Sequence, residues 1–453
     1  MNKQKSPALI AWVVVALTSG CATYHPAPIE PTQVLEALEA IPWQPMQAGP
    51  DALDNPGLLS NGAGPQELSA FAVGTNPHLA AVRAEAGIRR ALLVESGLLP
   101  DPEIGWDAMD VLASQIVEGT SSTTDALSGF GVMFPILRPG ERNARIGVAK
   151  WSAEEARRLV TAVEWSLTRD IHIAYEEVRG AEVLLAQTQA LAEIAASTSE
   201  YFKRARNSGA ATAIQANLAL GAVQAIRLDI VRAEARGERA RQELNALLGL
   251  PPSAEVPLRN TEDPSTSEFL TEGVEELTAH AVDSRPDLAV LLADYQAAEE
   301  GVRIAISKQY PLFAIGTGIR FTVPIFSKFG RPAIRTAIAR REQLGREFTA
   351  AIHSTRQQIA DAHTLWRLAE REVELIENEL LPNAEQSLAL SQDAFQAGEV
   401  TLLETLALQR ALIDARTRHA EIHVERSKRA WTLLAASGWL LGARLTNNQE
   451  GSK

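Results

Sequence analysis

The strongest constraint in this sequence is an internal repeat that keeps one spacing along most of its length. The segment FPILRPGER at residues 134–142 is similar to VPIFSKFGR at 323–331, and NPHLA at 76–80 is similar to RPDLA at 285–289. Three matched pairs lie 189 residues apart: Pro135 and Pro324, Gly209 and Gly398, and Gly249 and Gly438. A constant spacing through 114 residues indicates two copies of one unit without a net insertion or deletion.

Both copies carry the heptad pattern of long, closely packed helices. In the first copy the pattern runs from Ile171 to Ala195. In the second, small and apolar residues recur at alternating steps of four and three: Ile352, Thr355, Ile359, Ala362, Trp366, Ala369, Val373, Ile376, Leu380, Asn383, Ser387, Leu390, Ala394 and Ala397.

The spacing between landmarks also predicts how long these helices are. From the repeated proline to the mid-repeat glycine each copy has 74 residues, which as one helix would span roughly 110 Å. We expect each helix to end near Gly209 or Gly398 and a second helix of about 35 residues to return beside it. A structural coiled coil is one interpretation of this pattern. The small residues in the seams favour another, a curved wall of helices lying side by side.

Two strand-like inserts precede the long helices. In the first, at 101–136, apolar residues such as Ile104 and Trp106 alternate with polar ones. In the second, at 311–326, Phe313, Ile315, Ile319 and Phe321 occupy one face, and Gly316-Thr317-Gly318 predicts a turn. This alternation is typical of a membrane β-barrel, and an antiparallel hairpin packed on a soluble core is the alternative.

The second insert is short for a membrane hairpin. It has 13 residues from Pro311 to Pro324, against 35 from Pro100 to Pro135. A tilted strand that spans a membrane needs about 9–11 residues. The sequence therefore predicts a truncated second hairpin and a barrel that is incomplete or shortened.

The N-terminus has the pattern of an exported lipoprotein. Lys3 and Lys5 precede an apolar run at residues 8–17, and small residues lead to Cys21, the only cysteine. We expect residues 1–20 to be a signal peptide and Cys21 to carry a covalent lipid; cleavage nearby without lipidation is the alternative. The run is too short to span a membrane as a helix. A single cysteine excludes an intrachain disulfide.

Together these features predict six segments. They are the signal peptide at 1–20, an extended lipid-anchored arm at 21–64, a first repeat at 65–250, a linker at 251–275, a second repeat at 276–442 and a tail at 443–453. The expected fold class is mainly α, with a small β portion.

Composition and motifs argue against several other functions. The net charge of −13 disfavours nucleic acid as a partner, because phosphate binding needs clustered Lys and Arg. No nucleophile has a recognisable base, so an enzyme is not expected. His419 and His423 lie four apart in HAEIH and could bind a metal. The order is not HExxH and no third ligand is evident nearby, so an ordinary surface pair is the preferred interpretation.

The combination of the Cys21 context, the duplicated NPHLA and RPDLA helices, the proline-started hairpins and the GEVTLLE turn at 398–404 resembles the TolC/OprM outer membrane factor family, most of all its heavy-metal-exporter branch. The resemblance covers residues 66–442. It implies a homotrimer whose strands share one β-barrel in the Gram-negative outer membrane and whose helices form a trimeric α-barrel in the periplasm. It also implies a periplasmic adaptor and an inner-membrane pump, of the RND type, as partners.

The resemblance assigns roles to particular residues. Gly209 and Thr212, with Gly398 and Thr401, fall at the periplasmic tips that contact the adaptor. Glu404 falls at the narrow end of the tunnel, where three copies would form an acidic ring, and Gln215 is its counterpart in the first repeat. A solvated residue on the helix surface is the alternative for Glu404. The function implied is a passive exit duct. A helical scaffold lipoprotein that conducts nothing is the alternative.

Overall fold

The computed structural model describes residues 24, 26–42, 62–106, 130–261, 264–316, 319–397 and 399–441. Two units are distinguished, residues 1–42 and residues 43–453. The first contains the helix α2 (Pro31–Glu39), which has no buried residue. The predicted signal peptide, Cys21 and the predicted tail at 443–453 lie outside the described residues.

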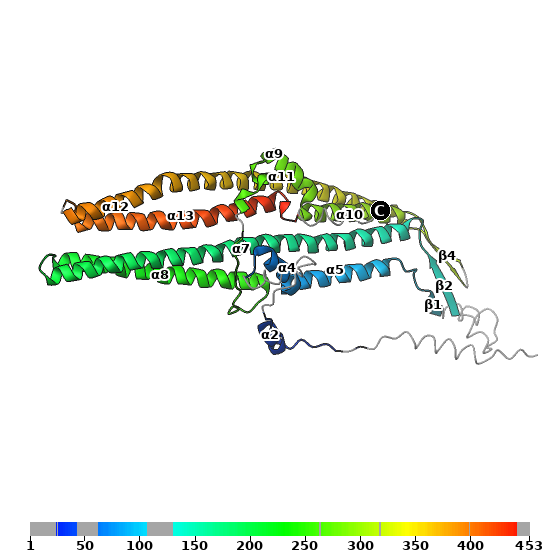
Figure 1. The fold of residues 1–453 in the computed structure, drawn as a ribbon. Helices are drawn as coiled ribbons and strands as arrows, with labels where there is room; N and C mark the ends of the chain where they lie inside the picture. The colour runs from blue at the N-terminus through cyan, green and yellow to red at the C-terminus, as the bar shows by residue number, and fades with distance from the viewer. Residues whose placement is uncertain are drawn as a thin grey trace, which may run out of the picture. The chain divides into compact units, whose positions relative to one another are not determined.

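The second unit consists mostly of helices arranged in two similar halves (Figure 1). The first half has α4 (Pro65–Thr75), α5 (Pro77–Ser96), strands β1 (Glu103–Trp106) and β2 (Phe130–Ile136), α7 (Glu141–Asn207) and α8 (Ala213–Leu248). The second half has α9 (Val274–Ser284), α10 (Pro286–Ser307), strands β3 (Leu312–Gly316) and β4 (Ile319–Thr322), α11 (Arg331–Leu375), the π-helical turn η6 (Ile376–Leu380), α12 (Leu381–Ala397) and α13 (Leu402–Ala436). Short 3-10 turns complete it: η3 (Pro264–Thr266), η4 (Glu268–Thr271), η5 (Lys328–Gly330) and η7 (Trp439–Leu441).

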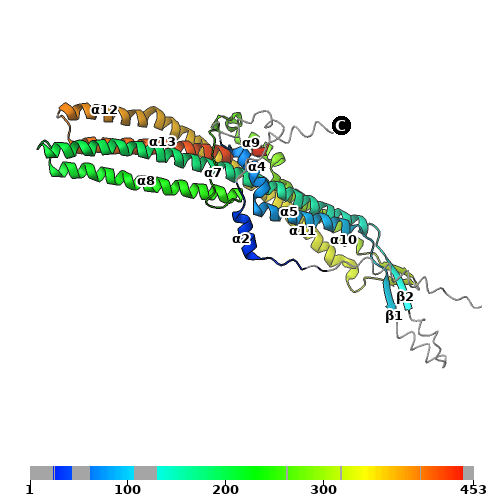
Figure 2. The ribbon, with the colours of Figure 1, turned by 60° about the horizontal axis from the view of Figure 1, so that its bottom comes forward.

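The predicted helical hairpins are confirmed. The helix α7 has 67 residues, about 100 Å at 1.5 Å per residue, and α8 returns beside it over 36 residues. In the second half α11, η6 and α12 form one continuous rod, and α13 returns beside it (Figures 1 and 2). The helix α7 also contacts α5, α10 and α13, so it joins the two halves.

The two repeated pentapeptides tie each half together at the same point. Asn76 caps α5 and donates from its amide to the carbonyl of Leu247 at the end of α8 (2.9 Å). Arg285 precedes α10 and donates to the carbonyl of Ala436 at the end of α13 (3.1 Å). Leu247 and Ala436 are themselves 189 residues apart. Different side chains thus satisfy the same orphan carbonyl at the end of each returning helix.

The seams are built from small residues, as the heptads predict. On α11 the six seam residues Thr355, Ile359, Ala362, Trp366, Ala369 and Val373 are all buried. Gly180 of α7 faces Val424 of α13, and a Cβ at position 180 would lie 2.1 Å from a Val424 methyl group. Only glycine therefore allows the two backbones to approach this closely.

The predicted heptad register fails from Leu380 onward, since Leu380 is itself 37% exposed, and the π-helical turn is the reason. After η6 the buried residues are Leu388 and Ser391, whereas the heptad predicts Ser387 and Leu390; Leu390 is 62% exposed. A π-turn accommodates one additional residue and rotates everything that follows on the helix. The sequence pattern continues unbroken through this turn, so the heptad alone could not reveal it.

The four strands form one antiparallel sheet in the order β1-β2-β3-β4. The two inserts meet where β2 pairs with β3, with Phe134 opposite Ile315. The strands β3 and β4 have five and four residues, well short of the 9–11 that a tilted spanning strand needs. The second hairpin is therefore truncated, as predicted. Thr317 and Gly318, in the predicted turn, lie outside the described residues.

The first prediction concerns the close approach of α7 and α13. Gly180→Ala introduces a methyl group that must displace Val424, so we expect a loss of about 1–3 kcal/mol despite the better helix propensity of alanine. Gly221→Ala on α8 is the matched control, because nothing lies within 4 Å of a Cβ there. The measurement is the melting temperature of each variant. Equal melting temperatures would contradict the assigned contact.

A second prediction concerns His172 of α7, which is 4% exposed and packs against Trp431 of α13, with tilted rings whose centroids are 4.1 Å apart. Burial lowers the pKa of His172 from 6.5 to about 4. Below pH 6.5 the imidazole therefore binds a proton in the unfolded chain and stays neutral in the folded chain. As the pH falls from 6.5 towards 4, the free energy of unfolding decreases, on the order of 3 kcal/mol in all. We expect His172→Phe to flatten the dependence of melting temperature on pH over this range, and His353→Gln, at an exposed position, to leave it unchanged. An equally steep dependence in His172→Phe would contradict this assignment.

Candidate functional site

The tip of the first hairpin is a short, well-capped turn. The helix α7 ends at Asn207, and Gly209 adopts a left-handed conformation with φ of 79°. The helix α8 then begins with a capping box: Gln215 accepts from the Thr212 backbone N–H (2.8 Å), and Thr212 accepts from the Gln215 backbone N–H (3.2 Å). The chain therefore reverses with its first backbone donors satisfied.

The tip of the second hairpin has the same construction. Glu404 accepts from the backbone N–H of Thr401 (2.7 Å) and from its hydroxyl (2.9 Å). The backbone and side-chain hydrogen bonds from Thr401 lower the pKa of the fully exposed Glu404. Gly398 lies outside the described residues, so its role stays a prediction.

Glu404 and Gln215 thus share a local structural role that the sequence analysis missed. Both are the fourth residue of a capping box, T-x-x-E at 401–404 and T-x-x-Q at 212–215. That four-residue signal is visible in the sequence and could have revealed the role. An aperture role for Glu404 is compatible with the cap, because its carboxylate is exposed, and it stays a prediction.

The two hairpins contact each other close to these tips. Phe202 of α7 and Phe395 of α12 have ring centroids 5.6 Å apart, and Phe202 is 4% exposed. Further along, Gln409 of α13 donates to Thr198 of α7 (3.2 Å), and Arg410 of α13 pairs with Asp229 of α8 (3.3 Å). Phe202 is buried, the hydrogen bond between Gln409 and Thr198 is half-buried, and the pair of Arg410 and Asp229 is exposed. Leu406 of α13 also packs on the cluster around Phe202. Both apolar and polar contacts therefore join the two hairpins near the tips.

The opposite end carries the sheet, and one face of it is apolar and exposed. In register across the strands lie Phe134, Ile315 and Ile319, and beside them Ile136, Phe313 and Phe321. These six side chains are 46–77% exposed. On the other face Ala314 is buried, and Arg320 pairs with Glu103 (3.6 Å). Such an apolar band, on a sheet that has its ion pair on the other face, is typical of a surface that is covered in the assembled protein, either by lipid or by other protein.

The pair His419 and His423 is brought together on α13, and the structure adds a third group that the sequence did not predict. Glu377, on the π-helical turn η6, places a carboxylate oxygen 3.0 Å from Nε2 of His423. Burial, and secondarily the neighbouring His419, lower the pKa of His423. Glu377 lies 42 residues before His419, so spacing gave no signal for it.

Comparison with known proteins gives a family-model match to part of the chain and two distant relatives. Residues 71–250 match the family model of the outer membrane efflux protein. Over 377 residues the chain is 24% identical to the cobalt-zinc-cadmium resistance protein CzcC of Cupriavidus metallidurans, covering 79% of this chain and 86% of that protein. It is 23% identical over 392 residues to the pyoverdine export outer membrane protein OpmQ of Pseudomonas aeruginosa, covering 79% and 81%.

Solved structures show the same fold. CusC matches with a TM-score of 0.69 and 15% identity over 92% of this chain and all of that one. VceC of Vibrio cholerae matches with a TM-score of 0.67 and 17% identity over 83% and 96%. The architecture is that of the outer membrane channel proteins. The match to the outer membrane efflux protein model over residues 71–250, the two relatives and the shared fold all agree with the resemblance to the TolC/OprM family.

A third prediction separates the two roles of Glu404. Glu404→Gln keeps a capping box of the kind that Gln215 forms, so we expect an unchanged melting temperature. If Glu404 also lines the aperture, the same variant removes one negative charge per chain and reduces the preference of the open channel for cations. Thr401→Ala is the matched control: it removes the cap, costs about 1 kcal/mol and keeps the charge. Unchanged cation selectivity in Glu404→Gln would contradict the aperture role.

Proposed function

We propose that this chain is the outer membrane exit duct of a tripartite efflux system, and that it conducts substrates passively from a periplasmic adaptor and an inner-membrane pump. The observation that carries the proposal is the apolar, exposed face of the four-stranded sheet at one end of the two capped helical hairpins. CzcC is named for resistance to cobalt, zinc and cadmium, and OpmQ is named for the export of pyoverdine. The two names give no common substrate, so the proposal concerns the conduit and names no substrate.

The open edges of the sheet support an assembly of several chains. Within the described residues β1 and β4 are the edge strands, and each is paired on one side only. Backbone groups in a membrane must all be paired, which a β-structure achieves only by closing into a barrel. Four strands are too few to close. We therefore propose a homotrimer in which β4 of one chain pairs with β1 of the next, giving one shared and short barrel.

The helices support the same arrangement. By length and composition α8 resembles a membrane-crossing helix, but only 22% of its most apolar window is buried within the chain. Its exposed apolar residues include Ile214, Leu228 and Val231. In a trimeric α-barrel the neighbouring chain covers such a surface. A membrane crossing by α8 would separate it from α7, which it contacts along its length.

The remaining partners are proposed from the resemblance and the geometry of the tips. The turn at 208–212 and the turn that ends at Thr401 are the proposed contacts with the adaptor. The pump behind it is proposed to be of the RND type. We further propose that Cys21 carries the lipid anchor that retains the protein at the Gram-negative outer membrane.

The short strands β3 and β4 favour one competing function. A periplasmic scaffold lipoprotein would keep the helices and the trimer, and its sheet would pack against protein without entering a membrane. The two functions differ in what surrounds the apolar face, because only the duct exposes it to lipid.

A fourth prediction tests that difference. Ile315→Arg places a charge on the apolar face, which costs about 2–4 kcal/mol in lipid. Arg320→Gln, on the other face of the sheet, is the control. We expect Ile315→Arg to shift the protein from a detergent-requiring trimer in the outer membrane fraction to material that is released or degraded, while Arg320→Gln fractionates as the wild type does. Normal fractionation of both variants would support the scaffold and contradict the duct.

A further inference from the structure

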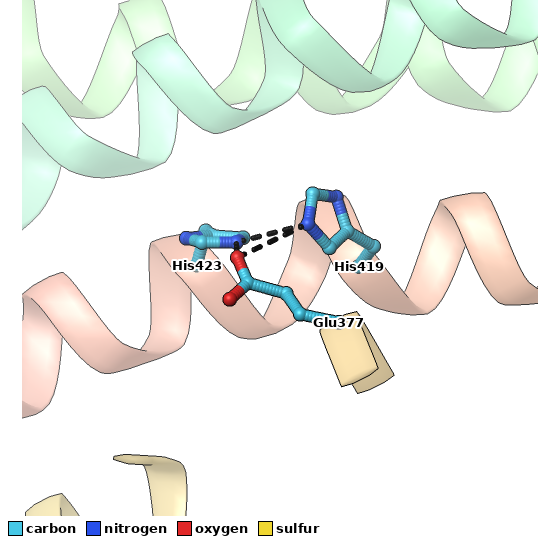
Figure 3. A group of neighbouring side chains, drawn as sticks. All are labelled: Glu377, His419 and His423. Carbon is cyan, nitrogen blue, oxygen red and sulfur yellow. Dashed lines mark hydrogen bonds and ion pairs between the residues drawn. The ribbon is translucent and has the colours of Figure 1, made fainter. Parts of the chain in front are cut away.

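Three potential ligand atoms converge where the π-helical turn passes α13 (Figure 3). A single carboxylate oxygen of Glu377 lies 3.0 Å from Nε2 of His423 and 3.5 Å from Nε2 of His419. The two Nε2 atoms are 3.1 Å apart. The side chains come from two different elements, and none belongs to the tips or to the sheet.

These three separations have the dimensions of one face of a tetrahedral metal site. Zinc binds imidazole nitrogen and carboxylate oxygen at about 2.0–2.2 Å. Two ligands at that distance from a tetrahedral ion are about 3.3–3.5 Å apart, so separations of 3.0, 3.1 and 3.5 Å require only a small adjustment.

Hydrogen bonding alone accounts poorly for this arrangement. A neutral imidazole has one N–H, so if His423 donates from Nε2 to Glu377, the lone pair of His419 Nε2 must share the same proton. If His419 donates to His423 instead, the short contact between His423 and the carboxylate has no proton. A cation at the centre satisfies all three atoms at once.

The local packing holds the two ligand-bearing elements in place. Ala369 and Val373 of α11 form a buried cluster with Ile422 of α13, and Ile376 packs against it. Ile376 and Ile422 directly precede Glu377 and His423 in sequence. The ligands therefore lie at the edge of a fixed apolar contact, which reduces the cost of organising them.

The first repeat lacks this group of residues. The positions 189 residues earlier hold Thr188, Ile230 and Glu234, and Thr188 lies inside the uninterrupted helix α7. The packing of a helical hairpin in this fold thus requires neither the π-turn nor the two histidines. Both occur together in the second repeat, and π-turns are frequent at functional sites.

We propose that Glu377, His419 and His423 bind one divalent first-row transition-metal ion per chain, with Zn²⁺ as the reference ion. The side chains of His419 and His423 are 27% and 34% exposed, and that of Glu377 is 44% exposed. The fourth coordination position therefore faces solvent and takes water. Two imidazoles and a carboxylate suit Zn²⁺, Co²⁺ and Ni²⁺ better than Ca²⁺ or Mg²⁺. The bound ion links the π-turn to α13.

The experiment uses the purified full chain in detergent, without a histidine tag and stripped with a chelator. Co²⁺ is added first, because a tetrahedral site with nitrogen ligands gives visible absorption far stronger than that of aqueous Co²⁺. Zn²⁺ is then titrated to displace it. We expect one Co²⁺ per chain and displacement by one Zn²⁺.

Matched variants assign the ligands. We expect His423→Gln, His419→Gln and Glu377→Gln each to weaken Zn²⁺ binding at least tenfold. His353→Gln and Glu374→Gln, exposed positions on α11 in the same repeat, should leave binding unchanged. Circular dichroism of each variant shows whether it is folded. Wild-type protein that binds no Co²⁺ in a tetrahedral site, or ligand variants that bind as tightly as the controls, would overturn the proposal. Neither outcome bears on conduction by the duct, which does not depend on this site.

Discussion

The structure depends on the packing of one long helix, α7, against five others. A helix of 67 residues cannot bury its apolar residues alone, and α7 does so by contacting α4, α5, α8, α10 and α13. Small residues make this possible, as where Gly180 leaves room for Val424. Because dispersion and burial increase as backbones approach, a seam of small residues compensates for the scarcity of large aromatic ones. The sheet and the tips are held at the two ends of this helical frame.

The two halves share the features that the internal repeat predicts. They differ at three places where the structure departs from the repeat. A backbone carbonyl at the end of each returning helix accepts a side-chain hydrogen bond at the equivalent position, from Asn76 in one half and from Arg285 in the other. Both tips use a capping box. The departures are the truncated second hairpin, the π-turn and the group of Glu377, His419 and His423. The truncated hairpin belongs to the sheet, and the other two departures lie at the same place in the structure.

Much of the fold follows from the sequence, because its determinants are local or periodic. The 189-residue spacing predicts two helical hairpins, and the heptads predict the buried residues of α11 as far as Val373. The alternation in 311–326 predicts the apolar face of β3 and β4. The capping role of Glu404 could also be predicted from the sequence, because T-x-x-E is a local signal of a capping box.

Other features are inaccessible to such reasoning. The π-turn leaves no mark in the heptad, yet it moves burial from Ser387 and Leu390 to Leu388 and Ser391. The position of Glu377 beside the two histidines depends on that turn and on the register between α11 and α13, so no spacing rule could connect it to His423. The pairing of β2 with β3 joins residues from the two repeats, and only the tertiary structure shows it.

The central claim is that three copies of this chain enclose a water-filled path through the outer membrane. Single-channel recording of the purified protein in planar lipid bilayers tests it most directly. The account predicts discrete conductance steps, with a low open probability or small conductance where the tips are closed. Protein that inserts as a stable trimer and gives no steps, even after the Phe202 and Phe395 contact is removed by Phe202→Ala to loosen the tips, would contradict it.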